Sequence, residues 1–264
     1  MAKIQYSFQR YEKKFILTPR QYQEMLPLLE PWMERDKYGE YTICSLYYDT
    51  DTFDLIRASV AKPPYKEKFR LRSYGVPGEN DPVFGEIKKK FDGVVYKRRV
   101  AAPLAEMERF LSGGLLSHES PQIQREIHWF LRCHPIRPQV FIGYDRTAYV
   151  GREERELRIT FDRNIRWRTR QLDLRAGDHG DPVLAEERII MEVKIPQAVP
   201  LWLVRALDRV GAYPDSFSKI GTCYQLHLAR KVFAPAVFAP AAPVAVTPAV
   251  FVPAASHERM KASC

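Results

Sequence analysis

The feature that most constrains this chain is the alternation of charged and apolar residues in segments typical of β-strands. In Phe69-Arg70-Leu71-Arg72 the guanidiniums fall on one face and the apolar side chains on the other, because successive side chains of a strand point to opposite faces. Residues 10–15, 84–91, 157–162 and 191–195 repeat this pattern. Each segment therefore predicts a strand with one apolar face and one face that bears Lys or Arg and an occasional carboxylate.

Strand-like segments rich in Tyr, Phe, Ile and Val dominate residues 1–232, and clusters of Pro, Gly and Asp separate them. Helical patterns interrupt them irregularly, and Thr18-Pro19 offers an N-cap and a first-turn proline to the first helix. This order favours an α+β fold with an antiparallel sheet over a doubly wound parallel one. The predicted strands are 9–17, 42–50, 67–74, 83–91, 93–100, 139–149, 156–167 and 188–195, and the predicted helices are 20–30, 104–111, 122–132 and 201–210.

The charged faces leave two interpretations open. A half-buried strand commonly presents charged side chains to water, so alternation alone does not decide between a solvated face and a concave cationic lumen. The 41 Lys and Arg against 32 Asp and Glu give the chain a formal charge of +9. This surplus favours an anionic partner, which on charge alone could be nucleic acid, a membrane surface or a phosphorylated small molecule.

Cysteine usage and hydropathy bear on the compartment. Cys44, Cys133, Cys223 and Cys264 form no Cys-x-x-Cys pair, so neither a zinc site nor a disulfide framework is indicated. The first residues lack the apolar stretch of a secretory signal, and no run of about 18 apolar residues occurs. We therefore expect a reduced, cytoplasmic protein without a transmembrane segment.

The last part of the chain has a different composition from the rest. Between residues 233 and 255 proline recurs every few positions, which defeats both a helix and a sheet ladder. We therefore expect one folded domain over 1–232 and a Pro/Ala-rich disordered tail over 233–264, with docking of the tail on a partner as the alternative.

Eight short motifs occur in one order between about residues 8 and 225. They are Arg10-x-Glu12-x-Lys14-Phe15, Ser45-Leu46-Tyr47-Tyr48-Asp49-Thr50, Lys68-Phe69-Arg70-Leu71-Arg72-Ser73-Tyr74-Gly75, Gly85-Glu86-Ile87-Lys88-Lys89-Lys90, Tyr144-Asp145-Arg146-Thr147-Ala148-Tyr149, Leu157-Arg158-Ile159-Thr160-Phe161-Asp162, Met191-Glu192-Val193-Lys194 and Phe217-Ser218-Lys219. In this order they resemble the VTC polyphosphate polymerase domain. That domain is the catalytic part of the vacuolar transporter chaperone complex and its bacterial relatives, in the triphosphate tunnel (CYTH-like) metalloenzyme superfamily.

The resemblance implies an antiparallel β-barrel tunnel of about eight strands with helices packed outside, so that the cationic faces line the bore. It implies that Lys219 closes one tunnel mouth and that Glu192 holds a divalent metal, Mn²⁺ or Mg²⁺, with Glu12 and Glu86 as further ligands. The side chains implied to hold phosphoryl oxygens are Lys14, Arg70, Arg72, Lys88, Arg146 and Arg158, joined by Lys97, Lys194 and Arg10.

The implied activity is a metal-dependent polyphosphate polymerase that transfers the γ-phosphate of ATP to a growing inorganic polyphosphate chain. Two alternatives remain: hydrolysis of inorganic or nucleoside triphosphates at the same site, and a non-catalytic module that binds polyphosphate. Phosphoryl transfer depends mainly on positioning and charge stabilisation, for which Arg, Lys and a carboxylate-held metal suffice. Nucleic acid is disfavoured as a partner, because no RRM, KH, zinc-finger or helix-turn-helix signature is present.

Two departures from the family limit the resemblance. The wider superfamily favours Glu-x-Glu-x-Lys in its first strand, and Arg10 replaces the first of these glutamates, which favours the polymerase-like branch. The eukaryotic complex also carries an inositol-phosphate-sensing domain and transmembrane helices, which this sequence lacks. Coupling to a membrane would therefore need a separate membrane-protein partner.

Overall fold

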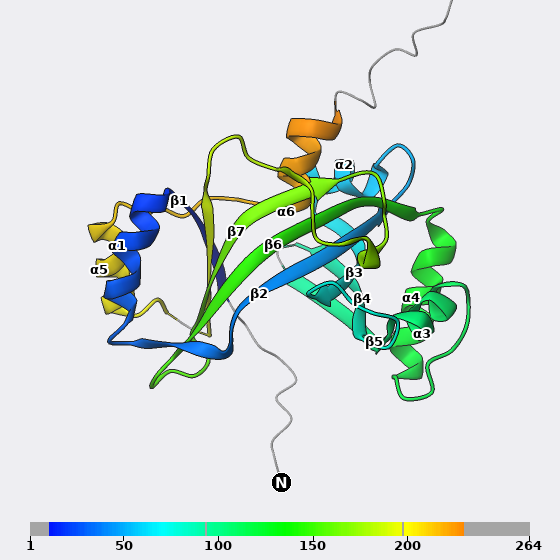
Figure 1. Cartoon of the computed structure of the whole chain (residues 1–264), viewed down its shortest axis with the longest axis horizontal. Coiled ribbons are helices and arrows are strands. Elements are labelled where there is room, and N and C mark those ends of the chain that lie inside the picture. Colours follow the sequence, from blue (N-terminus) through cyan, green and yellow to red (C-terminus); the bar gives the residue numbers. More distant parts are fainter. Residues whose placement is uncertain (1–10, 93, 197, 230–264) are drawn as a thin grey trace, which may run out of the picture. The chain divides into compact units, whose positions relative to one another are not determined.

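The computed structural model describes residues 11–229 apart from 93 and 197, so Arg10 and the predicted tail at 233–264 lie outside the described residues. The described part forms a nine-stranded antiparallel sheet with helices against it (Figure 1). The strands are β1 (Tyr11–Leu17), β2 (Met33–Asp49), β3 (Tyr65–Tyr74), β4 (Pro82–Phe91), β5 (Val94–Pro103), β6 (Arg137–Gly151), β7 (Arg158–Arg168), β8 (Asp181–Pro182) and β9 (Ile189–Ile195). The helices are α1 (Pro19–Leu29), α2 (Asp54–Val60), α3 (Leu104–Leu111), α4 (Pro121–Cys133), the 3₁₀ turn η1 (Leu174–Ala176), α5 (Leu201–Arg209), α6 (Lys219–Cys223) and the π-helical turn η2 (Tyr224–Leu228).

The strand order is β1-β9-β7-β6-β2-β3-β4-β5, with the short β8 beside β7. The predicted α+β fold with an antiparallel sheet is confirmed. The predicted tunnel of about eight strands corresponds to a curled sheet of nine strands among the described residues. This sheet is not strictly closed, because no ladder among its described residues joins the edge strands β1 and β5. We call the face that bears Lys14, Arg70 and Glu192 its inner face.

Helix α1 begins where the sequence predicts. The Thr18 hydroxyl accepts a hydrogen bond from the Gln21 amide at 3.2 Å, and the Gln21 side-chain oxygen accepts one from the Thr18 amide at 2.9 Å. This reciprocal capping satisfies two amides that the first helical turn leaves without partners, and Pro19 occupies a position where no amide hydrogen is needed.

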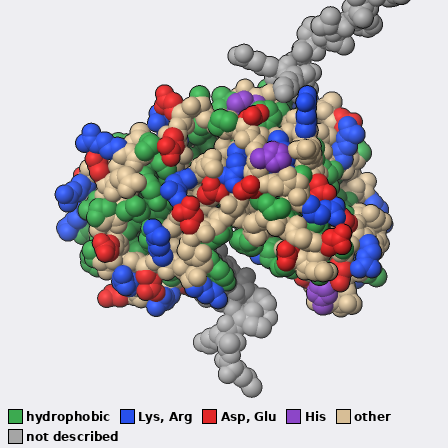
Figure 2. Space-filling view, in the orientation of Figure 1, with side chains coloured by type: hydrophobic (Ala, Val, Ile, Leu, Met, Phe, Trp, Pro, Cys, Tyr) green, Lys and Arg blue, Asp and Glu red, His purple; other side chains and the backbone are tan. Residues whose placement is uncertain are grey.

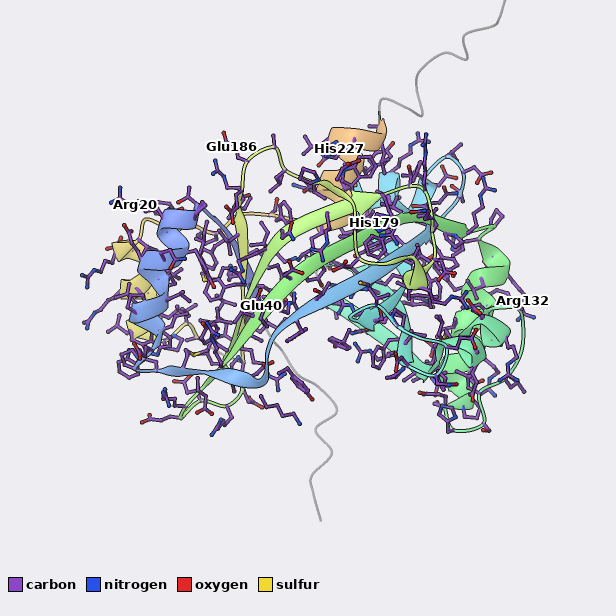
Figure 3. The ribbon with its side chains drawn as sticks, in the orientation of Figure 1. Arg20, Glu40, Arg132, His179, Glu186 and His227 are labelled. Atoms are coloured by element: carbon purple, nitrogen blue, oxygen red, sulfur yellow. The ribbon has the colours of Figure 1, made fainter. Side chains whose placement is uncertain are left out.

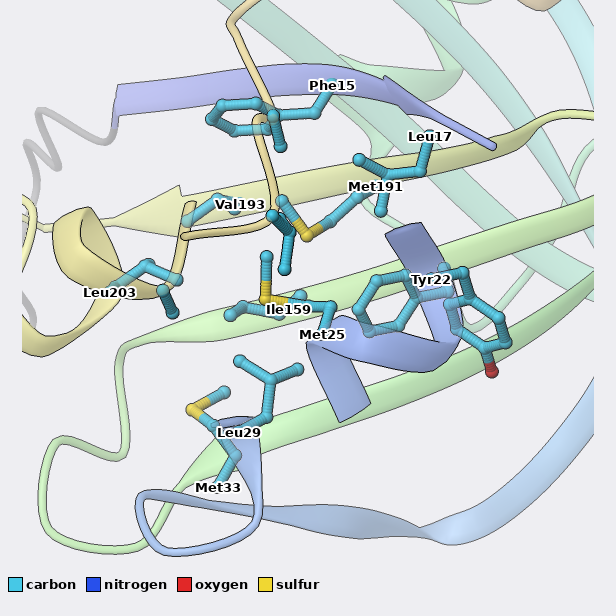
Figure 4. Close-up of a cluster of buried hydrophobic side chains, with 14 of the residues drawn as sticks. Phe15, Leu17, Tyr22, Met25, Leu29, Met33, Ile159, Met191, Val193 and Leu203 are labelled. Carbon is cyan, nitrogen blue, oxygen red and sulfur yellow. The ribbon is translucent and has the colours of Figure 1, made fainter. Parts of the chain in front are cut away.

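Two apolar cores lie against the outer face of the sheet. Helices α1 and α5 cover β1, β9 and β7, and Figure 4 shows Met25 and Leu203 beside Ile159 and Met191 in this cluster. Helices α3 and α4 cover β3, β4 and β5 in the same way. The apolar positions of the alternating strands therefore pack outward against helices, as the alternation requires. None of the described helices is long and apolar enough to cross a membrane.

A third core occupies one end of the inner face, which the sequence did not predict. Ile56 of α2, Ile220 of α6 and Phe217 just before α6 pack in one cluster with Ile142 of β6 and Trp167 of β7. Because this cluster fills part of the inner face, the charged side chains are confined to the remainder. The inner face is thus divided into an apolar region and a charged region.

Candidate anion-binding site

The strand register brings the predicted side chains of the described chain to the charged part of the inner face. Residues directly opposite each other on neighbouring strands share a face of the sheet. The registers concerned are Lys14 with Glu192, Glu12 with Lys194, Arg70 with Glu86, Lys88 with Lys97, Arg146 with Asp162 and Arg158 with Lys194. Arg72 lies two residues from Arg70 on the same face, and Lys219 enters from the start of α6.

Glu86 of β4 forms the centre of one charged cluster. Its Oε2 accepts from the Arg70 guanidinium at 2.8 Å, and its Oε1 lies 2.7 Å from Lys97 Nζ and 2.5 Å from Arg99 Nη2. Burial alone would raise the pKa of this carboxyl, but Arg70, Arg72 and Lys97 lower it well below its usual range. With both oxygens in contact with cations, Glu86 acts as a counter-ion here. Its predicted role as a metal ligand stays a prediction that these contacts do not favour.

Asp162 of β7 forms the centre of a second cluster, and sequence reasoning assigned it no role. It is fully buried, with Arg146 Nε at 2.6 Å and Lys219 Nζ at 2.5 Å. Burial opposes its ionisation, yet the charges of Lys219 and Arg146 lower its pKa to about 2. The signal was available in the sequence, because Asp162 shares a strand face with Arg158 four residues earlier.

Two buried tyrosines connect the clusters, and they too were missed. The Tyr47 hydroxyl accepts a hydrogen bond from Arg70 at 3.0 Å, and the Tyr144 hydroxyl accepts one from Arg72 at 3.2 Å. Burial would raise the pKa of Tyr47, but the positive charges of Arg70 and neighbouring cations lower it to about 8. Lys219 Nζ lies 4.3 Å from the centroid of the Tyr144 ring, a cation–π distance. The tyrosines therefore hold the cations in place without neutralising them.

Glu192 and Glu12, two of the predicted metal ligands, both lie close to Lys14. Lys14 Nζ lies 3.2 Å from Glu12 and 4.0 Å from Glu192, and Lys194 lies 2.8 Å from Glu192. Burial opposes the ionisation of Glu192, but Lys194 and Lys14 lower its pKa to about 2, so it is an anion at neutral pH. No group of three or more His, Cys, Asp or Glu in residues 11–229 is arranged to hold a metal by itself. Two carboxylates fit Mg²⁺ or Mn²⁺ only where phosphate oxygens and water complete the shell.

Several buried polar groups of the inner face have no hydrogen-bond partner among the described residues. They are Ser45 Oγ, Arg72 Nε and Thr160 Oγ1. Ser45 is opposite Arg72 in the β2–β3 register, and Thr160 is opposite Glu192 in the β7–β9 register. Since nearly all buried polar groups in native proteins are hydrogen-bonded, these atoms indicate a place for water or a polar ligand.

A groove of about 920 Å³ opens from the inner face between β1, β3, β4 and the segment 214–222. We call its lysine side the lysine mouth and define it as Lys66, Lys68, Lys88 and Lys90. Lys68 Nζ contacts Ser218 Oγ at 3.4 Å, and burial together with Lys88, Lys66 and Lys14 lowers its pKa to about 8 despite the opposing charge of Tyr47. No ion pair to a carboxylate involves these four lysines among the residues that the structure describes. The mouth is therefore cationic and poorly compensated.

The face of the molecule drawn in Figure 2 has no comparable bias. Figure 2 shows Lys and Arg interspersed with Asp and Glu over one face. In Figure 3 Arg20, Arg132 and Glu186 lie on peripheral elements, and Arg20 pairs with Glu24 along α1 at 2.8 Å. His179 and His227, labelled there, bond Gln171 and the Val183 carbonyl. Cations predominate on the charged part of the inner face, by contrast, and no described histidine lies there; His227 stacks on Trp167 in the apolar part.

Arg98 and Arg99 of β5 provide a test of whether anions bind on the inner face. Arg99 faces inward to Glu86, whereas Arg98 faces outward to Glu126 at 2.9 Å. We expect Arg99→Ala to weaken inorganic triphosphate binding by about 10-fold, because a charge-assisted hydrogen bond from the guanidinium to a phosphate oxygen is lost. Arg98→Ala should leave the dissociation constant unchanged in calorimetry. Equal effects of the two substitutions would contradict the placement.

Comparison with known proteins bears on the same residues. A family model described as the VTC domain matches residues 9–228. No curated protein matches the sequence. Among solved structures, this chain is similar to HpAC1 from Hippeastrum, which is named as an adenylyl cyclase and described as having a dominant triphosphatase activity. The two superpose with a TM-score of 0.51 at 17% identity, over 81% of this chain and 94% of that one. A Vibrio parahaemolyticus protein named as a candidate adenylate cyclase has a TM-score of 0.44 at 11% identity, over 83% and 98%. The likeness to HpAC1 shows that the two chains share a fold.

Proposed function

Because the chain belongs to the VTC domain family, we propose that it is a metal-dependent polyphosphate polymerase that transfers the γ-phosphate of ATP to the end of an inorganic polyphosphate chain. The observation that carries the proposal is the surplus of cations on the inner face. Its carboxylates Glu12, Glu86, Asp162 and Glu192 are already ion-paired, while Arg72 and Lys88 make no ion pair with a described carboxylate. A polyanion is the ligand that such a surface lacks.

The residues of this chain have separable tasks in that reaction. Arg70, Arg72 and Arg146 supply forked donors for phosphate oxygens and are held in position by Glu86, Tyr144 and Asp162. Glu192 and Glu12 would hold the divalent metal. When bound, the metal supplies charge neutralisation between phosphate oxygens. The accepting phosphate is already ionised near neutral pH, so no general base is required, and the absence of a histidine from the charged part of the described inner face is no obstacle.

Hydrolysis of a triphosphate is the second candidate, and one observation favours it. HpAC1, whose fold this chain shares, is described as having a dominant triphosphatase activity. Water would then replace the terminal phosphate of the polymer as acceptor, with the same cations in contact with the substrate. A non-catalytic polyphosphate-binding module would use those cations without turnover.

Product analysis distinguishes the three functions. The protein is incubated with ATP and Mn²⁺ or Mg²⁺, with and without a short polyphosphate primer, and the products are separated by gel electrophoresis and assayed for free phosphate. We expect long-chain polymer and stoichiometric ADP. Free phosphate without polymer, across metals and primers, would support the triphosphatase, and unchanged ATP with retained polyphosphate binding would support the binding module.

A further inference from the structure

Strand β5 lies at one edge of the sheet, and only one end of its free edge is covered (Figure 1). Along a strand of an antiparallel sheet, the backbone N–H and C=O groups of successive residues point alternately to the two sides. Those of Ala101 point away from β4, because its amide donates to Glu119 at 2.7 Å and its carbonyl oxygen lies 3.1 Å from His118 Nε2. The segment before α4 therefore closes the edge at Ala101.

The remainder of this edge is open. By the same alternation, the backbone groups of Val95, Lys97 and Arg99 point away from β4, and no described residue outside β5 pairs with them. Val95 and Tyr11 of β1 both line the groove of about 920 Å³, so this part of the edge borders open space and not a neighbouring strand. A row of unpaired N–H and C=O groups is a template for one further strand.

The outer face of the sheet beside the open edge is apolar and exposed. Val94 and Tyr96 point to this face, because the side chain of Arg99 points to the inner one and side chains alternate. Phe91 is opposite Val94, and Tyr65 is opposite Phe91. The exposed fractions are 53% for Val94, 49% for Tyr96, 56% for Phe91 and 47% for Tyr65. Large apolar side chains exposed together in this way are typical of an interaction surface.

The inner face beside the same edge is cationic. Lys97 and Arg99 both contact Glu86, which Arg70 contacts as well, so three cations share one carboxylate. A strand added to the edge would therefore meet apolar side chains on one face and cations on the other. Because the side chains of a strand alternate, the strand that fits has apolar residues at every second position and Asp or Glu between them.

The charges and the sequence exclude two other occupants. Pairing of β5 with β5 of a second copy would bring Lys97, Arg98 and Arg99 of both molecules together, and like charges on neighbouring strands are destabilising. Residues 233–255 of the chain contain no Asp or Glu, and proline recurs among them every few positions. Proline has no amide hydrogen to donate to a sheet ladder, so this segment does not fit the edge.

We propose that the open edge of β5 binds an acidic, extended segment of a partner protein, which joins the sheet as one more antiparallel strand. The backbone of that segment pairs with the free edge groups. Its apolar side chains pack on Val94 and Tyr96, and its carboxylates face Lys97 and Arg99. In this mode of recognition the backbone hydrogen bonds give affinity and the alternate side chains give selectivity. The partner surface does not depend on which phosphate reaction the inner face catalyses.

The probe is a short synthetic peptide that alternates Val and Glu, and its dissociation constant is measured by calorimetry at fixed ionic strength. In an antiparallel pair the Glu residues are opposite Val95, Lys97 and Arg99, and their amides point to β5. N-methylation of the Glu amides should therefore weaken binding by at least about 10-fold. N-methylation of the Val amides, which point to solvent, should leave the dissociation constant unchanged. Binding that survives methylation of the Glu amides overturns the proposal, because charge alone then holds the peptide.

Substitutions in the protein test the same edge. Val95→Pro removes an amide hydrogen that no described residue accepts, so the ladder with β4 should stay intact while the affinity for the peptide falls by about 10-fold. An unchanged melting temperature checks that this variant is folded. Tyr96→Ala should also weaken the peptide, whereas Leu115→Ala, which removes an 82% exposed apolar side chain elsewhere, should not.

Two results would contradict a peptide partner. The first is an unchanged affinity of folded Val95→Pro for the peptide. The second is binding of the protein to vesicles that contain phosphatidylserine, lost in Tyr96→Ala, when the peptide itself does not bind. The exposed apolar side chains would then form a membrane surface. Neither result affects the proposed polymerase, which the product analysis tests separately.

Discussion

Replacing Glu192 by Gln should lower the turnover of ATP by at least about 100-fold while polyphosphate binds as tightly as before or more tightly. The two functions of Glu192 predict opposite effects of this substitution on turnover and on polyphosphate binding. As a metal ligand it is needed for turnover, and as the counter-ion of Lys14 and Lys194 it reduces the positive charge of the inner face. The substitution therefore abolishes the first function, removes the counter-ion of Lys194, and leaves Lys14 paired with Glu12 alone.

The measurement combines steady-state ADP release with polyphosphate binding on the same preparation. Glu34→Gln is a matched control, because Glu34 is a half-buried carboxylate that pairs with Arg152 and Arg155 outside the site. A parallel loss of binding and turnover in the Glu192 variant would indicate a structural role. Undiminished turnover would remove Glu192 from the metal site.

The faces of the strands were predictable from the sequence because side-chain orientation in a strand has a period of two. Arg70 and Arg72 necessarily share a face with each other and not with Leu71, whatever the rest of the fold. The same rule places Lys97 and Arg99 together and sends Arg98 outward. The family resemblance supplied what periodicity left open, namely that these faces point inward to a common region.

The partners of the cations were not predictable, because they depend on which strands are neighbours and in which register. Asp162 meets Arg146 only because β6 lies beside β7 with a register shift between Gly143 and Asp145. Lys219 reaches the same carboxylate from a helix 57 residues later in the chain. The apolar core under α2 and α6 was missed for a related reason: short helices of five and seven residues carry too little periodicity to be recognised.

Asp162 is the residue whose substitution should cost the most stability. Asp162→Asn leaves Arg146 and Lys219, whose side chains are mostly but not fully buried, without their shared counter-ion, and breaking a buried ion pair from one side costs about 3–5 kcal/mol. For a domain of this size we expect the melting temperature to fall by about 10 °C. Because the folded-state pKa of Asp162 is lowered to about 2, its stabilising contribution is complete above the unfolded pKa of about 3.9 and is lost as the pH falls toward 2.

The same substitution tests whether the cations face a polyanion site. In Asp162→Asn the freed charges of Arg146 and Lys219 should make inorganic triphosphate raise the melting temperature by more than it does in the unmodified protein. Asp49→Asn is the matched control: Asp49 is also fully buried, but its carboxylate accepts hydrogen bonds from the Leu55 and Ile56 amides at the start of α2. The Asp49 variant should have a lower melting temperature, but inorganic triphosphate should raise that temperature by the same amount as in the unmodified protein. If triphosphate raises the melting temperatures of both variants equally, the anion binds elsewhere, because Asp162 competes with phosphate for the cations of the inner face and Asp49 does not.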